Sequence, residues 1–173
     1  MTRLLLLSLL LAGSLAAASD RPVFQVGAPD PTADKPQSKI WYQEGSWWAL
    51  LPDKWGPSLW ERTRNGWQLY EETTQKLSGL PGRGDVWYDA DGVTAVLVAD
   101  RSLTVLRMTR KLGVWKTKVL ARWAVLTQAP IETATIARDG KRRWWIAAPV
   151  SSQVMVWSSM DAAEWTTATV LAQ

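Results

Sequence analysis

The chain has 173 residues, a net charge of +4, 47% hydrophobic residues, and neither histidine nor cysteine. The missing side chains exclude Ser-His and Cys-His nucleophilic catalysis, zinc sites that need imidazole or thiolate ligands, and a disulfide framework. No Asp-rich loop has the spacing of a calcium site. We therefore expect no metal and no cofactor.

The N-terminus has the form of a secretory signal peptide. Arg3 gives a basic start, an apolar run covers residues 4–15, and small residues precede Ser19. The run is shorter than the ~20 residues that a transmembrane helix needs. We therefore expect residues 1–19 to be a signal peptide and the mature chain to be secreted or periplasmic. Residues 20–37, rich in Pro, Asp and Ala, predict an extended lead-in.

A short strand that runs into a tight turn occurs three times after the lead-in. The turn glycines Gly45, Gly92 and Gly140 lie 47 residues (45 to 92) and 48 residues (92 to 140) apart. Each turn is followed by an apolar strand, a third strand, and a tryptophan that opens a fourth strand. A period of roughly 40 to 50 residues with four short strands is typical of a β-propeller blade. The three tryptophans are Trp67, Trp115 and Trp165.

The strands follow the same order in each repeat. The first repeat spans residues 38–73, and its Asn65-Gly66 pair is a strong hairpin signal. The second spans residues 84–122, where a continuous β-branched segment is typical of a strand buried on both faces. The third spans residues 132–171, and none of the three shows unbroken helical periodicity. The expected strands are 39–43, 46–51, 58–63 and 67–71, then 85–89, 93–99, 103–109 and 115–120, and finally 143–148, 154–158 and 165–171, with a loop at 52–57.

The predicted fold is all-β, a partial β-propeller of about three four-stranded antiparallel blades. Closed propellers have four to eight blades, so an arc of three leaves two open flanks that invite pairing with other chains. Three explanations stay open. The chain is a truncated product or fragment with missing C-terminal blades, copies of it close a ring as a homo-oligomer, or the lead-in builds part of another blade. We favour the first.

The turns before the closing tryptophans resemble the Asp-boxes of BNR-repeat, sialidase-like propellers, whose pattern is Ser-x-Asp-x-Gly-x-Thr-Trp. The third repeat reads SMDAAEW at residues 159–165, the second TRKLGVW at 109–115, and the first a shortened TRNGW at 63–67. The resemblance implies that the Ser and Asp satisfy backbone N–H groups in the turn and that the Trp covers the edge between blades. It assigns Trp67, Trp115, Ser159, Asp161 and Trp165 to the structure of the repeat.

The same resemblance bears on catalysis. Sialidases hold a carboxylate with three arginines and use a Tyr-Glu pair with an aspartate. This chain lacks the Arg-Ile-Pro start of those enzymes, and Tyr42 and Tyr88 occupy equivalent repeat positions, which indicates packing. We therefore expect a non-enzymatic relative with no catalytic residue. An incomplete sialidase-type glycoside hydrolase and a structural or protein-interaction module are the alternatives.

Ligand binding is the function that the sequence favours. Trp55 lies in the loop between the second and third strands, where the second repeat has no aromatic residue. Such loops share one face of a propeller with the links between blades, and an indole beside charged groups suits stacking on carbohydrate. We expect a carbohydrate or another extracellular ligand there. The candidate ligand-binding residues are Trp55, Arg83, Asp85, Asp100 and Arg101.

The remaining tryptophans and charged motifs are interpreted as scaffold. The pairs Trp47-Trp48 and Trp144-Trp145 lie in second strands, so each pair points to both faces of a sheet, and we expect all four to be buried between blades. Trp41 and Trp87 are expected to pack between blades as well. The basic cluster at 141–143 is interpreted as a solvated turn rather than a nucleic-acid site.

Overall fold

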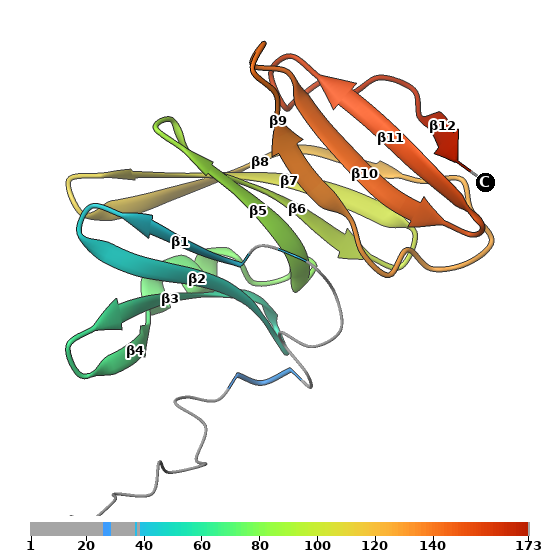
Figure 1. Ribbon diagram of the computed structural model, residues 1–173. Coiled ribbons are helices and arrows are strands. Elements are labelled where there is room, and N and C mark those ends of the chain that lie inside the picture. Colours follow the sequence, from blue (N-terminus) through green and yellow to red (C-terminus); the bar gives the residue numbers. More distant parts are fainter. Residues whose placement is uncertain (1–25, 29–36, 38, 173) are drawn as a thin grey trace, which may run out of the picture.

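The computed structural model describes residues 26–28, 37 and 39–172. The signal peptide expected at 1–19 lies outside the described residues, as does most of the lead-in expected at 20–37. The described chain forms three four-stranded antiparallel sheets, each made of strands that are consecutive in the sequence (Figure 1). The predicted all-β fold of three four-stranded antiparallel units is therefore confirmed.

The three sheets have the same simple order of neighbouring strands. Sheet 1 contains β1 (Ile40–Gln43), β2 (Ser46–Asp53), β3 (Gly56–Thr63) and β4 (Gly66–Leu69). Sheet 2 contains β5 (Arg83–Asp89), β6 (Gly92–Ala99), β7 (Ser102–Lys111) and β8 (Val114–Ala124). Sheet 3 contains β9 (Thr135–Arg138), β10 (Trp144–Val150), β11 (Gln153–Ser159) and β12 (Thr169–Ala172). Sheet 2 is the middle one, because β5 contacts β2 on one side and β9 on the other.

The hairpin between β2 and β3 is tighter than the sequence suggested. The loop expected at 52–57 is reduced to Lys54 and Trp55, because Pro52 pairs with Pro57 and Asp53 with Gly56. Gly56 has φ 138°, and a Cβ there would lie 2.7 Å from the Leu77 carbonyl oxygen, so a larger residue would be strained and crowded. The glycine thus lets the chain after sheet 1 cross close to this turn.

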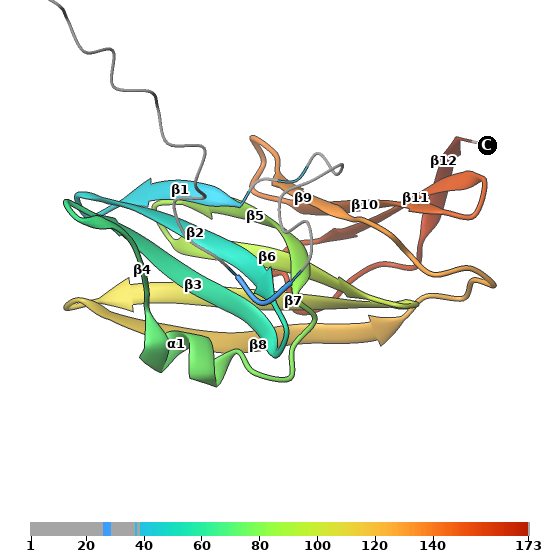
Figure 2. The ribbon, with the colours of Figure 1, turned by 90° about the horizontal axis from the view of Figure 1, so that it is seen from below.

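One helix, α1 (Glu71–Lys76), follows β4, where the sequence predicted a strand to residue 71 and then a turn-rich link. That expectation was wrong for these six residues. Glutamates fill the first turn, and Lys76 in the last turn pairs with Glu72 at 2.6 Å, which favours the helix dipole. The helix lies against β3 and β8, beneath the outer strands in Figure 2. No helix in the described part of the chain is long and apolar enough to cross a bilayer.

The core between sheets 1 and 2 is aromatic. Trp115, fully buried, meets the ring of Trp48 edge-on at 5.1 Å and that of Trp41 at 6.0 Å. The guanidinium of Arg110 lies 4.8 Å from the centre of the Trp48 ring and pairs with Glu44 at 2.7 Å. An interblade position for Trp41 is thereby confirmed.

The core between sheets 2 and 3 combines apolar packing with an ion-pair network. Trp87 packs against a cluster that contains Ile136 and Trp144. Arg138 pairs with Asp89 at 2.7 Å and with Asp91 at 3.0 Å, and its guanidinium lies 4.8 Å from the Trp144 ring. Both internal contacts between sheets therefore use an arginine that stacks on an indole and reaches a carboxylate in a hairpin of sheet 1 or 2.

The adjacent tryptophan pairs do not behave as expected. Trp48 and Trp144 are buried, but Trp47 is 51% exposed and Trp145 is 36% exposed. Among the described residues, sheet 2 alone has a sheet on each face. The outward faces of sheets 1 and 3 therefore leave one indole of each pair in contact with solvent.

Candidate functional site

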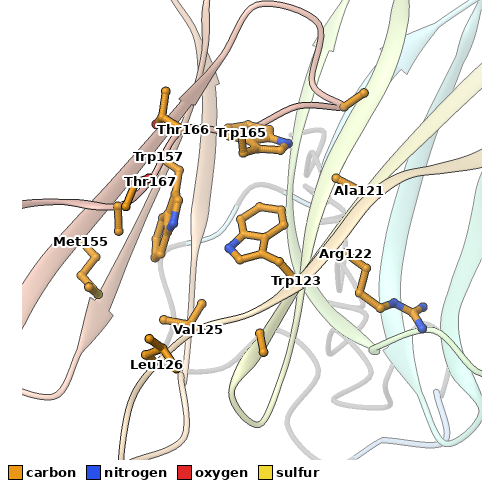
Figure 3. A pocket seen from close by; sticks show the side chains of 13 residues that line it. Ala121, Arg122, Trp123, Val125, Leu126, Met155, Trp157, Trp165, Thr166 and Thr167 are labelled. Atoms are coloured by element: carbon orange, nitrogen blue, oxygen red, sulfur yellow. The ribbon is translucent and has the colours of Figure 1, made fainter.

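A groove lined by tryptophans lies where sheet 2 meets sheet 3 (Figure 3). The end of β8 with residues 124–126 forms one wall, and β11 with the segment 163–168 forms the other, around about 580 Å³. The ring of Trp123 lies 5.7 Å from that of Trp165 in a stacked arrangement and 6.1 Å from that of Trp157 edge-on. Three indoles from two sheets thus meet in one open groove.

The groove has an apolar floor and a polar rim. Trp157 is buried, whereas Trp123 and Trp165 are half-buried. Exposed residues such as Leu126 and Thr166 border them, whereas Arg122 points to the opposite face of β8, where its Nε donates to the Thr104 hydroxyl at 3.2 Å (Figure 3). The buried Nε1 of Trp123 has no acceptor in the described part of the chain. The site therefore offers aromatic faces and the hydroxyls of Thr166 and Thr167.

Trp123 was missed by the sequence analysis, which ended the fourth strand of the second repeat at residue 120. In the structure β8 continues to Ala124, and Trp123 pairs with Leu103 of β7. A register shift near Val105 and Leu106 accompanies the longer strand. The apolar and aromatic residues of segment 119–123, among them Val119 and Trp123, were the signal that could have extended the strand.

Trp165 reaches the groove from a turn and not from a strand. The expected strand 165–171 begins only at Thr169. The Ser159 hydroxyl accepts from the Ala162 N–H at 2.9 Å. Asp161 accepts from the N–H groups of Ala163 and Glu164 at 2.8 and 2.9 Å. The indole of Trp165 donates to the Ala162 carbonyl at 3.0 Å, so the turn also orients the ring.

The charge of Asp161 is stabilised by this turn. The backbone N–H groups of Glu164 and Ala163, followed by the Ser159 hydroxyl, hold the pKa of Asp161 below its ordinary value. The carboxylate is therefore ionised at neutral pH and engaged by the backbone. It has the geometry of a turn-forming group and not that of a proton donor to a ligand.

The three tryptophans of the repeat have different surroundings. Trp115 is fully buried between sheets 1 and 2, and Trp165 is half-buried against Trp123 of sheet 2. Trp67 packs against the cluster of Ala49, Leu51 and Trp60 on the outward side of sheet 1.

Asp100 and Arg101 line a hollow next to the groove. Residues 124–126 also line this adjoining hollow of about 810 Å³, whose other walls are residues 99–102, 127–128 and Ser151. Asp100 and Arg101 pair with each other at 3.4 Å, and both are exposed. Their backbone carbonyls accept from Ile131 and Val125, which ties the β6–β7 turn to the link between sheets 2 and 3. The charged hollow and the aromatic groove thus lie beside each other and share residues 124–126 as lining.

The other exposed candidates lie elsewhere. Trp55 is 69% exposed at the β2–β3 turn, and the Lys54 ammonium lies 5.1 Å from the centre of its ring. Arg83 is exposed at the start of β5. Neither residue lines the groove or the adjoining hollow.

Asp85 is buried between sheets, which leaves it unavailable as part of a ligand rim. Its side chain is only 5% exposed, and its Oδ2 accepts from the Ile136 N–H at 2.8 Å, so it links β5 to β9. The same carboxylate attracts the Lys39 ammonium, whose pKa burial nevertheless lowers. Asp85 therefore belongs to the start of β5 and connects sheet 2 to sheet 3.

The basic cluster forms a hairpin turn. Arg142 pairs with Asp91 at 2.9 Å, and the guanidinium of Arg143 lies 5.7 Å from the centre of the Trp145 ring. Asp139 accepts from the backbone N–H groups of Lys141 and Arg143, both at 2.9 Å, and from the indole of Trp145 at 2.9 Å. The cluster is thus part of a structured turn with local partners.

Among the described residues, no carboxylate and no tyrosine lines the groove. The same residues contain no group of three or more His, Cys, Asp or Glu side chains that could hold a metal ion. Tyr70 donates to the Gly113 carbonyl at 3.0 Å, while Tyr42 and Tyr88 are about half exposed, at 52% and 40%. The packing expected of the last two is therefore incomplete. Comparisons with protein-family models, curated proteins and solved structures gave no match.

Proposed function

We propose that this chain is a non-enzymatic, exported module that binds carbohydrate in the groove of Trp123, Trp157 and Trp165. The groove is the observation that carries the proposal. Ligand sites are concave, mostly apolar, and carry a few polar groups that fix orientation. Indole faces can cover the apolar C–H face of a sugar ring, while hydroxyl groups at the rim bond its hydroxyls.

The dimensions favour an oligosaccharide. The groove, at about 580 Å³, lies within the range of roughly 300–1,000 Å³ typical of small-ligand sites. The hollow at Asp100 and Arg101 shares residues 124–126 with the groove. A chain of several sugar units that crosses these residues would occupy both.

Two further features support the remainder of the proposal. The leader-like residues 1–19 support export, where glycans are abundant ligands. The hydrogen bonds that Ser159 and Asp161 accept from backbone N–H groups of their own turn support a place among BNR, sialidase-like propellers. No residue is proposed to be catalytic.

A glycan array followed by calorimetric titration tests the proposal. We expect the chain to retain a defined oligosaccharide, and Trp165→Ala to weaken its binding about tenfold. The matched control is Trp55→Ala, which removes an exposed indole outside the groove and should change the affinity less than twofold.

Three outcomes would contradict the proposal. Failure to retain any glycan would remove the binding function. Loss of affinity in Trp55→Ala with normal affinity in Trp165→Ala would move the site to the β2–β3 turn. Release of sugar from a bound oligosaccharide or from an aryl glycoside would make the protein a hydrolase.

A further inference from the structure

The outward faces of sheets 1 and 3 carry groups like those that form the contact between sheets 1 and 2. We call the side of each sheet that faces the preceding sheet, or would face it, its leading face, and the opposite side its trailing face. Between sheets 1 and 2, the leading face of sheet 2 supplies Arg110 and Trp115, and the trailing face of sheet 1 supplies Trp48. Glu44, in the β1–β2 turn, completes the contact with Arg110.

The leading face of sheet 1 repeats the first half of this contact. Arg62 lies opposite Trp67 across β3 and β4, as Arg110 lies opposite Trp115 across β7 and β8. Tyr42 and Trp47, on the same face, are 52% and 51% exposed, and their rings touch at 5.4 Å. An arginine and several aromatic rings are thus displayed with no sheet in front of them in the described part of the chain.

The trailing face of sheet 3 repeats the second half. Trp145 of β10 corresponds to Trp48 of β2, since both belong to a second strand and face away from the preceding sheet. Trp145 is 36% exposed. Asp139, in the β9–β10 turn, corresponds to Glu44 and is exposed. Further along this face, Pro149 and Val154 pair with each other and are also exposed, which extends the apolar surface.

We propose that a second copy of this chain docks the leading face of its sheet 1 on the trailing face of sheet 3. Arg62 of one protomer stacks on Trp145 of its partner and pairs with Asp139, as Arg110 stacks on Trp48 and pairs with Glu44 within one chain. Two copies contribute six sheets, a number within the four to eight of closed propellers. A head-to-tail contact closes when it is made twice around a two-fold axis.

The segment at residues 26–28 leaves this contact free. Val26 packs against Ala49, Leu51 and Trp60, and the Gly27 N–H donates to Asp53 at 3.0 Å. These contacts lie toward the β2–β3 turn, at the opposite end of sheet 1 from the β1–β2 turn. The end that carries Arg62 and Trp47 stays exposed and meets the second copy.

Sedimentation equilibrium over loading concentrations up to about 100 μM tests the contact. We expect a dimer for the wild-type chain, and at least a tenfold weaker dimer for Arg62→Glu and for Trp145→Ser. Arg64→Glu, which makes the same charge change in the β3–β4 turn, and Trp55→Ser are matched controls that should dimerise normally. Circular dichroism confirms that each variant is folded.

A charge exchange makes the test specific. Arg62→Glu and Asp139→Arg should each be monomeric, because both contacts of either pair of identical chains bring like charges together. An equimolar mixture should dimerise, since one contact is then wild type and the other has its charges exchanged. A monomeric wild-type chain, a dimer indifferent to Arg62→Glu and Trp145→Ser, or a mixture that stays monomeric would overturn the proposal. Glycan binding is proposed for the groove between sheets 2 and 3, and it is measured separately on the same variants.

Discussion

The two internal contacts between sheets contain similar groups, but one is closed and the other leaves a groove. Between sheets 1 and 2, Trp115 is completely buried against Trp41 and Trp48. Between sheets 2 and 3, Trp123 and Trp165 stack but remain half-buried around about 580 Å³. Aromatic content alone therefore does not decide whether an edge between sheets is sealed.

Helix α1 accounts for the difference. It lies between β3 and β8, and Leu77, directly after it, is fully buried in the core that contains Trp115. The Thr74 hydroxyl accepts from the Leu59 N–H at 3.0 Å, which fixes the helix to β3. At the second contact the corresponding place is occupied by the segment 163–168, which lines the groove instead of filling it. The short helix α1 thus accounts for a closed core at one contact and an open groove at the other.

Truncation of the central indoles should give the largest difference in stability between the two contacts. Trp115→Ala is expected to lower the free energy of unfolding by about 3–5 kcal/mol, because it leaves a large cavity in a closed core. Trp165→Ala should cost less than half as much, since the ring is half-buried beside open space. Urea denaturation followed by circular dichroism measures both, with Trp55→Ala as the control. Equal losses for Trp115 and Trp165 would contradict the distinction.

Truncation of Leu77, which fills the core beside α1, should have the next largest effect on stability. Leu77→Ala is expected to cost about 3 kcal/mol, because a fully buried leucine side chain is lost. Leu112→Ala, at a fully exposed leucine in the β7–β8 turn, is the matched control and should change stability by less than about 0.5 kcal/mol. Urea denaturation monitored by circular dichroism gives both values. A loss below about 1 kcal/mol for Leu77→Ala would show that α1 does not seal the contact.

The link between β5 and β9 should have a smaller effect. Asp85→Ala leaves the buried Ile136 N–H without this acceptor, and we expect a loss of about 1–3 kcal/mol in the free energy of unfolding. Asp100→Ala removes an exposed carboxylate and should cost less than about 0.5 kcal/mol. Urea denaturation of the two variants compares the loss of a buried hydrogen-bond acceptor with the loss of an exposed carboxylate. Similar values would remove the structural assignment of Asp85.

The smallest expected effect is a loss of stability at acidic pH. The pKa of Asp161 is held low in the folded state by the N–H groups of Glu164 and Ala163, so its contribution is complete above the ordinary carboxyl pKa of about 3.9. It is lost as the pH falls through the lowered value. Asp161→Asn should therefore be less stable than wild type near pH 6, and the difference in melting temperature should shrink towards pH 3. A difference that is constant with pH would exclude this mechanism.

Much of the fold could be predicted from local patterns. Tight turns such as Asn65-Gly66 and the alternation of apolar residues predicted most of the strands, because these depend on neighbours in the sequence. Helix α1 was missed because its six residues are polar and short, and its stability depends on the fit of Leu77 into a core between two sheets. The exposed Trp47 and Trp145 were mispredicted since burial depends on whether another sheet faces them.

The candidate site was harder to predict than the fold. Asp100 and Arg101 do line a hollow next to the groove, but Asp85 lies inside the structure, and Trp123 was assigned no role. A groove between two sheets is made of residues more than 30 positions apart, here Trp123 and residues 155–168. No periodicity in the sequence records that proximity.

The sequence by itself determined an all-β chain of three repeated four-stranded units, because strand periodicity and turn residues act over a few positions. Only the tertiary structure decided which indoles are buried, which line a groove and which face solvent. The reason is that burial belongs to pairs of surfaces, and a strand carries no local mark of the surface that will cover it.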